Sequence, residues 1–122
     1  MLFRSAANGG AIYNTGILGL YSLNFSNNAA LSFNSPFFNG SSRGGGIYNA
    51  GNLTIMASVF VKNNATITAN SNRSGYGGAI SSSLGTVGIT NSTFSQNSAN
   101  NGSGGIGGGN GLGGAVDRKS VV

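Results

Sequence analysis

Side chains capable of acid–base or nucleophilic chemistry are scarce in this sequence. The 122 residues include one acid, Asp117, and neither cysteine nor histidine. A glycosidase typically needs two carboxyl groups flanking the bond that it breaks, and a serine nucleophile needs a neighbouring base. Lys62 has no partner placed beside it by the sequence. We therefore expect no enzyme active site and no thiolate or imidazole metal site in this chain.

One glycine-rich segment formally fits a nucleotide-binding motif. Residues 109–114 read Gly-Asn-Gly-Leu-Gly-Gly, which matches G-x-G-x-x-G. That motif binds a dinucleotide only inside a βαβ unit with an acid further along the chain, and the sequence indicates neither. The glycine-rich calcium repeat also requires an Asp that is absent here. We expect a glycine loop, and neither a cofactor nor a metal ion.

The formal net charge of +5 results from a near absence of acids, because six Lys and Arg residues stand against one Asp. Arg4, Arg43, Lys62 and Arg73 fall at unrelated points of the chain. A nucleic-acid surface needs a basic stripe, usually with stacking aromatic residues. We interpret these residues as isolated solubilising charges and expect no nucleic-acid partner.

The chain is organised by a repeat of about 35 residues. Four copies begin with the same motif, which is Gly-Gly, a small residue and then Ile or Val. In three of these copies Phe-x-x-Asn follows. A period between about 20 and 50 residues is typical of solenoids, propellers and arrays. It also argues against the disordered segment that 23 glycines and 6% charged residues would otherwise suggest. The repeated positions are Ile12, Ile47, Ile80 and Val116, then Phe25, Phe60 and Phe94, and finally Asn28, Asn63 and Asn97.

Each copy predicts short strands and no helix. The opening around Ile47 and Tyr48 is a brief apolar segment between turn residues, which is typical of a strand. Leu53 and Ile55 alternate with polar residues, so we expect a second strand that continues to Phe60. Glycine at this density would cost about 1 kcal/mol per residue in helix interiors. Alternating apolar residues predict a third strand in the first copy, at Ala29, Leu31 and Phe33, and in the second copy, at Ala65, Ile67 and Ala69. The third copy lacks this pattern.

These strands predict an all-β fold, a parallel β-helix. Short strands that repeat in one direction cannot bury their inward faces alone, but they can if each copy is one coil stacked on the next, about 4.8 Å away. The Ile and Phe positions would then form two apolar ladders. We expect the Asn ladder at corners, where Asn tolerates left-handed backbone angles and its amide can bond a neighbouring coil. The alternative to this structural role is an Asn array that binds sugar or ice. Ice binding would need a regular Thr ladder, which the sequence does not supply.

The chain divides into a lead-in at residues 1–8, β-helix repeats at 9–116 with copies starting near 9, 44, 77 and 113, and a tail at 117–122. The tail equals the translation of GAT CGG AAG AGC GTC GTG, which resembles a common sequencing adapter. We therefore interpret it as non-native, and the chain as about three coils and the start of a fourth from a longer array. Neighbouring coils of the same parent chain would be its first partners. The sequence has no apolar run long enough for a signal peptide or membrane span, so we expect any export signal to lie outside it.

Gly-Gly-Ala-Ile at 77–80 paired with Phe-Ser-Gln-Asn at 94–97 resembles the repeat of the chlamydial polymorphic outer membrane proteins. The resemblance covers nearly everything from Gly9 to Val116. It implies a right-handed β-helix passenger of an autotransporter, secreted and displayed at the cell outer membrane, where it would act as an adhesin toward a host surface or glycan. The alternative is a non-catalytic fragment of a carbohydrate-active β-helix enzyme, a polysaccharide lyase or glycoside hydrolase.

Overall fold

The computed structural model describes residues 8–32, 41–67, 74–100, 111–112 and 115–118. All regular elements in these ranges are β-strands. A helix able to cross a membrane is therefore not found in the described part of the chain.

The strands are short and follow one another at corners. In chain order they are β1 (Ile12–Asn14), β2 (Ile17–Tyr21), β3 (Asn24–Ser26), β4 (Ala29–Ser32), β5 (Ser42–Arg43), β6 (Ile47–Asn49), β7 (Asn52–Met56), β8 (Val59–Val61), β9 (Asn64–Ile67), β10 (Gly75–Tyr76), β11 (Ile80–Ser82), β12 (Val87–Thr90), β13 (Thr93–Ser95), β14 (Ser98–Asn100), β15 (Gly111–Leu112) and β16 (Val116–Arg118).

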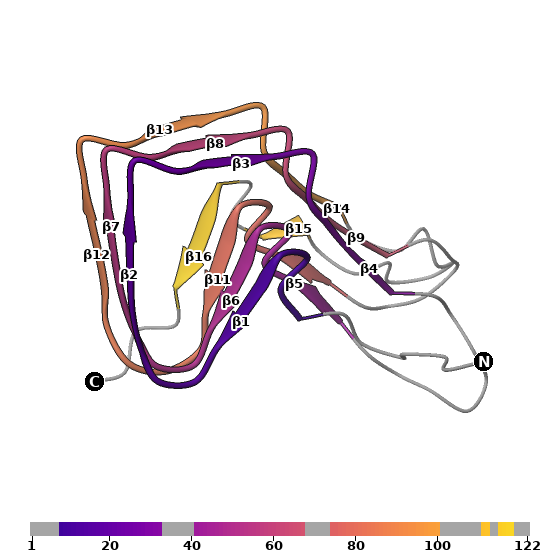
Figure 1. Ribbon diagram of the computed structural model, residues 1–122. Helices are drawn as coiled ribbons and strands as arrows, with labels where there is room; N and C mark the ends of the chain where they lie inside the picture. Colours follow the sequence, from indigo (N-terminus) through magenta and orange to yellow (C-terminus); the bar gives the residue numbers. More distant parts are fainter. Residues whose placement is uncertain (1–7, 33–40, 68–73, 101–110, 113–114, 119–122) are drawn as a thin grey trace.

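Each strand pairs in parallel with its counterpart one repeat away. The sheet β1-β6-β11-β16 has four strands, and the four sheets β2-β7-β12, β3-β8-β13, β4-β9-β14 and β5-β10-β15 have three each. Figure 1 shows these rows as successive turns of one path around a common axis. The fold is a parallel β-helix of three coils and the start of a fourth, as the sequence predicts.

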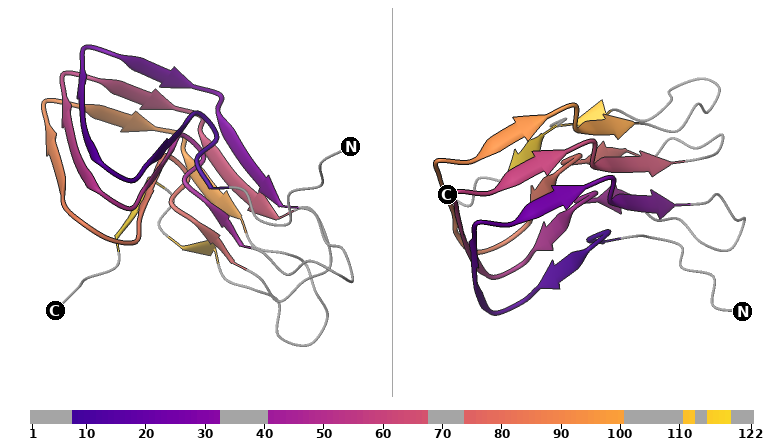
Figure 2. Two further views of the ribbon diagram at one scale, coloured as in Figure 1. Left: turned by 60° about the horizontal axis from the view of Figure 1, so that its bottom comes forward. Right: turned by 45° about the horizontal axis from the view of Figure 1, so that its top comes forward.

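Each coil has a wide part and a narrow part. The sheets that begin with β1, β2 and β3 surround the wide part, and the sheets of β4 and β5 lie against each other in the narrow part (Figures 1 and 2). In the narrow part, Ser42 Oγ donates a hydrogen bond to the Thr66 carbonyl at 2.7 Å. A Cβ on Gly75 would lie 2.4 Å from the Ala65 carbonyl oxygen. The backbone approach at Gly75 therefore leaves no room for a side chain at that position, although Ile67 further along β9 is buried.

The apolar core fills the wide part and consists of ladders. Ile12, Ile47, Ile80 and Val116 are in register across the four-stranded sheet. The rings of Phe25, Phe60 and Phe94 are stacked, with centroids 4.7 and 4.8 Å apart and nearly parallel planes. Phe60 is fully buried and Phe25 is 8% exposed, whereas Phe94 is partly buried. The middle coil is the best covered because it has a neighbour on each side.

The Asn ladder is present, but its backbone differs from the prediction. Asn28 Nδ2 donates to Asn63 Oδ1, and Asn63 Nδ2 donates to Asn97 Oδ1, each at 2.9 Å. The left-handed backbone angles belong to the preceding residues, Asn27, Lys62 and Gln96, with φ near +55°. The expectation that the ladder Asn residues adopt these angles was therefore wrong. The preceding residue makes the turn, which leaves the Asn side chain free to point inward.

The second predicted strand is in fact two strands. Ser22, Ala57 and Asn91 have φ of +53°, +50° and +46° and separate the β2 row from the β3 row. Ser58 stabilises this corner, because the Leu23 amide donates to Ser58 Oγ at 3.2 Å. A left-handed residue turns the chain without a glycine, so the corner leaves no Gly or Pro signal in the sequence.

The third predicted strand exists in all three described coils. In the first coil, however, the residues predicted to point inward point outward. Ala30 and Ser32 are buried in β4, whereas Leu31 is 40% exposed. In the second coil Ala65 and Ile67 are buried as predicted. The corner position sets which residues point inward, and it outweighs the hydrophobicity of a single Leu. Phe33 and Ala69 lie outside the described residues.

Strand β14 corrects the prediction that the third copy lacks this strand. It pairs with β9, with Ser98 opposite Asn64 and Asn100 opposite Thr66. Ser98 Oγ and Asn100 Nδ2 both donate to Asn64 Oδ1 at 3.1 Å. Polar side chains on the outer face hold this pair together, so no apolar alternation is required.

The start of the fourth coil continues through part of the predicted tail. Asp117 pairs with Ser81 and Arg118 with Ser82 in the β16–β11 ladder. Main-chain pairing accepts most side chains and is compatible with a non-native segment. Most of the lead-in, residues 109–110 and 113–114 of the glycine loop, and residues 119–122 lie outside the described residues.

Candidate binding groove at the Gly-Gly corner

The repeated Gly-Gly motif forms the corner between the β5 row and the β1 row. The first glycine of each described copy, Gly9, Gly44 and Gly77, has φ of +72°, +63° and +60°. A Cβ at Gly44 would lie 1.9 Å from the Ile47 carbonyl oxygen, which no side chain can tolerate. Glycine is therefore required both by the left-handed backbone and by the close approach of the chain to itself.

Two rows of residues meet at this corner, and their exposure ranges from 56% for Tyr13 to 7% for Tyr48 and 3% for Ser81. The residue before Gly-Gly provides one row and the residue after Ile or Val provides the other. We call the surface between them the Gly-Gly groove. Its first wall contains Asn8, Arg43 and Tyr76, and its second wall contains Tyr13, Tyr48, Ser81 and Asp117.

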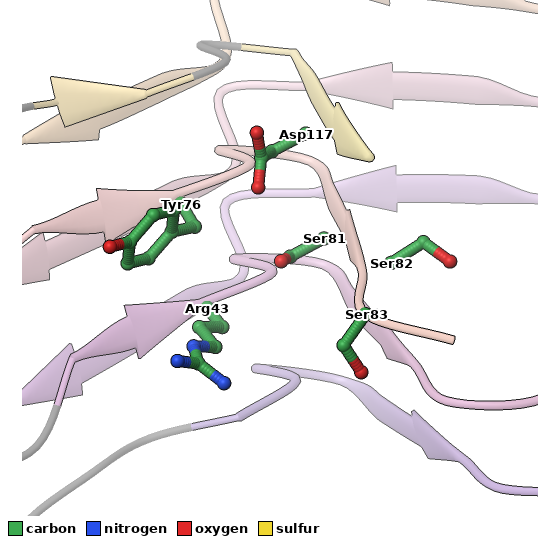
Figure 3. Close-up of a pocket in the computed structure, with 6 residues that line it drawn as sticks. All are labelled: Arg43, Tyr76, Ser81, Ser82, Ser83 and Asp117. Atoms are coloured by element: carbon green, nitrogen blue, oxygen red, sulfur yellow. The ribbon is translucent and has the colours of Figure 1, made fainter. Parts of the chain in front are cut away.

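A small hollow lies in the groove between the two walls. Arg43 and Tyr76 line it from the first wall, and Ser81 and Asp117 line it from the second (Figure 3). Ser83, which follows β11, also lines it. It occurs where Ser81 replaces the tyrosine that precedes it in the ladder, Tyr48. Its volume of about 10 Å³ is room for roughly one water molecule.

Ser82 also borders the hollow, but its side chain points away from it (Figure 3). Its Oγ accepts a hydrogen bond from Asn49 Nδ2 at 3.0 Å, and Asn49 Oδ1 accepts one from Asn14 Nδ2 at 2.7 Å. These three residues form a second buried polar ladder that repetition of Phe-x-x-Asn does not reveal. Ser82 therefore belongs to the interior.

Contacts between side chains fix the groove walls. The Arg43 guanidinium lies over the Tyr76 ring, 5.4 Å from its centroid, at cation–π distance. The Tyr13 and Tyr48 rings have centroids 5.1 Å apart and are tilted by 33°. Tyr48 Oη and Ser83 Oγ share a hydrogen bond of 2.7 Å. The aromatic and cationic groups are therefore held in place before any ligand binds.

The groove contains side chains of the kinds found in binding sites. It offers a guanidinium, serine and tyrosine hydroxyls and aromatic rings, all of which form contacts with polar ring compounds. Asp117 is the one carboxylate side chain in the sequence, so the chain cannot supply the pair of carboxyl groups used by most glycosidases. No cluster of three or more His, Cys, Asp or Glu residues occurs within the described ranges.

The ladder residues singled out by the sequence lie inside the β-helix, away from the groove walls. The groove residues Arg43, Tyr48, Tyr76 and Ser81 were missed as a group because their identities change from coil to coil. A positional signal was available, since each lies next to the Gly-Gly-x-Ile motif. Of the four scattered charges, Arg43 lies in the groove and Lys62 is exposed at another corner, as the predicted scatter requires. Arg4 and Arg73 lie outside the described residues.

The described residues contain no regular threonine ladder. Thr54 is flanked by Gly19 and Gly88 in register, and Thr66 by Leu31 and Asn100. The geometry therefore gives no support to ice binding on these two outer faces. Comparison with family models, with curated proteins and with solved structures found no match for this chain.

Proposed function

We propose that this chain is a structural segment of a secreted or cell-surface β-helix protein, an adhesin or autotransporter passenger. The observation that supports this is the division of each coil into an inside and an outside. Phe25, Phe60 and Phe94 stack inside, whereas Arg43 and Tyr76 form an outward groove. A stacked solenoid of this kind presents an extended surface for binding.

A carbohydrate-active β-helix protein is the second candidate function. The groove favours it, because Tyr76, Arg43 and Ser81 line one hollow. The catalytic acids would have to come from parts of the parent protein beyond this sequence, which contains a single Asp. The chain would then provide substrate contacts without performing the reaction.

Surface display is tested by labelling intact cells of the source organism with an antibody raised against the folded chain. We expect labelling without permeabilisation and loss of the signal after brief treatment of intact cells with protease. An antibody against a cytoplasmic protein serves as the control for cell integrity. Signal that appears only after permeabilisation would contradict a surface location.

Adhesion is tested with antibody fragments directed against the groove. These fragments should reduce attachment of intact cells, and fragments against the opposite outer face, at Thr54, should not. Equal attachment in the presence of either fragment would contradict the proposed adhesive role of the groove. It would not contradict surface display.

A further inference from the structure

We propose that the Gly-Gly groove binds an acidic glycan, a linear polysaccharide with carboxylate groups, lying along the axis of the β-helix. The inference rests on the proposed surface function and names the ligand of that surface. Three features carry it: the tyrosines of the walls, the position of Arg43 and the size of the hollow.

The tyrosines provide faces on which sugar rings can pack. Three of the four tyrosines in the sequence, Tyr13, Tyr48 and Tyr76, belong to the groove walls. Sugar rings present C–H groups on one face, and these pack against aromatic rings. Tyr13 is 56% exposed and Tyr76 is partly exposed, whereas Tyr48 is 7% exposed and its ring packs against that of Tyr13. Tyr13 and Tyr76 therefore provide the ring surface that a sugar can reach, and Tyr48 supports Tyr13 from beneath.

Arg43 selects a carboxylate. Its guanidinium is planar and is already oriented by the Tyr76 ring, 5.4 Å away. A guanidinium forms two parallel hydrogen bonds with a carboxylate, which an ammonium group cannot do. The net charge of +5 also attracts anions toward the molecule at long range.

The hollow limits how the ligand can lie. Its volume of about 10 Å³ accepts one oxygen atom and excludes a sugar ring. A ring must therefore lie outside, over the tyrosines, with one oxygen directed between Arg43 and Ser81. A carboxylate substituent on the ring satisfies this geometry.

Asp117 opposes the ligand. It lines the same hollow (Figure 3), and its negative charge repels a carboxylate. It belongs to residues 117–122, which we interpret as non-native. Removing this charge should therefore strengthen binding, a result opposite in sign to the loss of Arg43.

The experiment is a calorimetric titration of the full 122-residue chain with a hexamer of a (1→4)-linked uronic acid. The protein variants are Arg43→Gln, Asp117→Asn and, as a matched control, Lys62→Gln. Lys62→Gln removes the same charge from another corner, where Gln96 already occupies the equivalent position of the next coil with φ of +54°. Circular dichroism and thermal unfolding verify that each variant folds.

We expect Arg43→Gln to weaken binding about tenfold or more, since it removes the charge-assisted hydrogen bonds to the carboxylate. Lys62→Gln should change the affinity by less than about threefold, because an exposed distant charge is screened by salt. Asp117→Asn should tighten binding. An uncharged hexamer of the same linkage should bind more weakly than the uronic acid.

Three results would overturn the proposal: no binding of the uronic acid hexamer, equal losses in Arg43→Gln and Lys62→Gln, or equally tight binding of a single-stranded DNA of the same charge. If Arg43→Gln fails to fold, Arg43→Lys and Asp117→Asn replace it, and unchanged affinity in both would also overturn the proposal. Failure here leaves the cell-labelling result untouched, so the two proposals fail independently.

Discussion

The apolar ladders of this β-helix repeat the same or similar residues from coil to coil, whereas the walls of the Gly-Gly groove vary. Phe25 and Phe60 stack with nearly parallel rings, but the groove position of Tyr48 is held by Ser81 in the next coil. An interior side chain must fit a copy of itself on each side. A groove side chain need not match its neighbours in this way: Tyr48 and Ser81 are 7% and 3% exposed, and one replaces the other without breaking the strand pairing. Stacking therefore fixes the interior and leaves the groove free to acquire a ligand.

The largest effect should follow from Phe60→Ala, which breaks the interior ladder at its centre. Phe60 is fully buried between two stacked rings. Its truncation should lower the free energy of unfolding by about 3–5 kcal/mol, through lost burial and the cavity left behind. Denaturant unfolding followed by circular dichroism measures the change.

Lys62→Ala is the control for the Phe60 variant, because Lys62 is exposed two residues further along. An exposed substitution of this kind usually changes stability by less than about 0.5 kcal/mol. If Lys62→Ala were as damaging as Phe60→Ala, the assignment of the interior ladder would be wrong.

Asn63→Ala should have the next largest effect, since it interrupts the polar interior ladder. Asn63 Nδ2 donates to the Phe25 carbonyl and to Asn97 Oδ1, and Asn63 Oδ1 accepts from Asn28. Removing the side chain leaves buried partners without hydrogen bonds, which should cost about 2–3 kcal/mol. A thermal unfolding midpoint equal to that of the unmodified chain would show that water replaces the amide at no cost.

Gly44→Ala tests whether the groove corner is as constrained as the interior. The left-handed backbone alone costs an alanine about 1–2 kcal/mol, and its Cβ would lie 1.9 Å from the Ile47 carbonyl oxygen. We expect a loss of about 2 kcal/mol or more in chemical denaturation. Gly88→Ala is the matched control, because nothing lies within 4 Å of the position that its Cβ would occupy. It should be neutral or slightly stabilising, and equal losses in both variants would refute the corner argument.

The smallest expected effect is a gain in stability from Lys62→Gly. Lys62 has φ of +56° and is exposed. Glycine removes a left-handed penalty of about 1–2 kcal/mol and adds about 0.5–1 kcal/mol of chain entropy in the unfolded state. The net gain should be about 0.5 kcal/mol, measured as a higher denaturant midpoint. A lower midpoint would indicate that the Lys62 side chain has a packing role that its exposure does not reveal.

The sequence predicted the parts of the fold in which residues repeat. Ile47 and Phe60 have counterparts at a nearly constant spacing, so the coil and its register could be derived without a structure. The face of β4 that points inward could not be derived in this way. The alternating pair Ala29 and Leu31 is as suitable for burial as the pair Ala30 and Ser32. Only the corner at Asn27, with φ of +56°, decides between the two faces.

The groove could not be predicted from repetition, since Arg43 and Tyr76 occupy equivalent positions in different coils. The proximity of the two groove walls depends on the Gly-Gly corner, which joins the β5 row to the β1 row. Strand β14 was missed for a related reason. Its pairing depends on hydrogen bonds from Ser98 and Asn100 to Asn64, and polar residues of this kind are also typical of loops.

The hydrogen bonds that join one Asn side chain of the ladder to the next all run in one direction along the rod. Asn28 Nδ2 donates forward to Asn63 Oδ1, and Asn63 Nδ2 donates forward to Asn97 Oδ1. Each coil therefore presents Asn donors on the side of the next coil and Asn acceptors on the side of the preceding coil, so that successive coils are complementary. Gene recombination that adds or deletes one whole period would rejoin compatible ends, whereas a partial period would not. The length of such a rod can therefore vary during evolution in steps of a single coil.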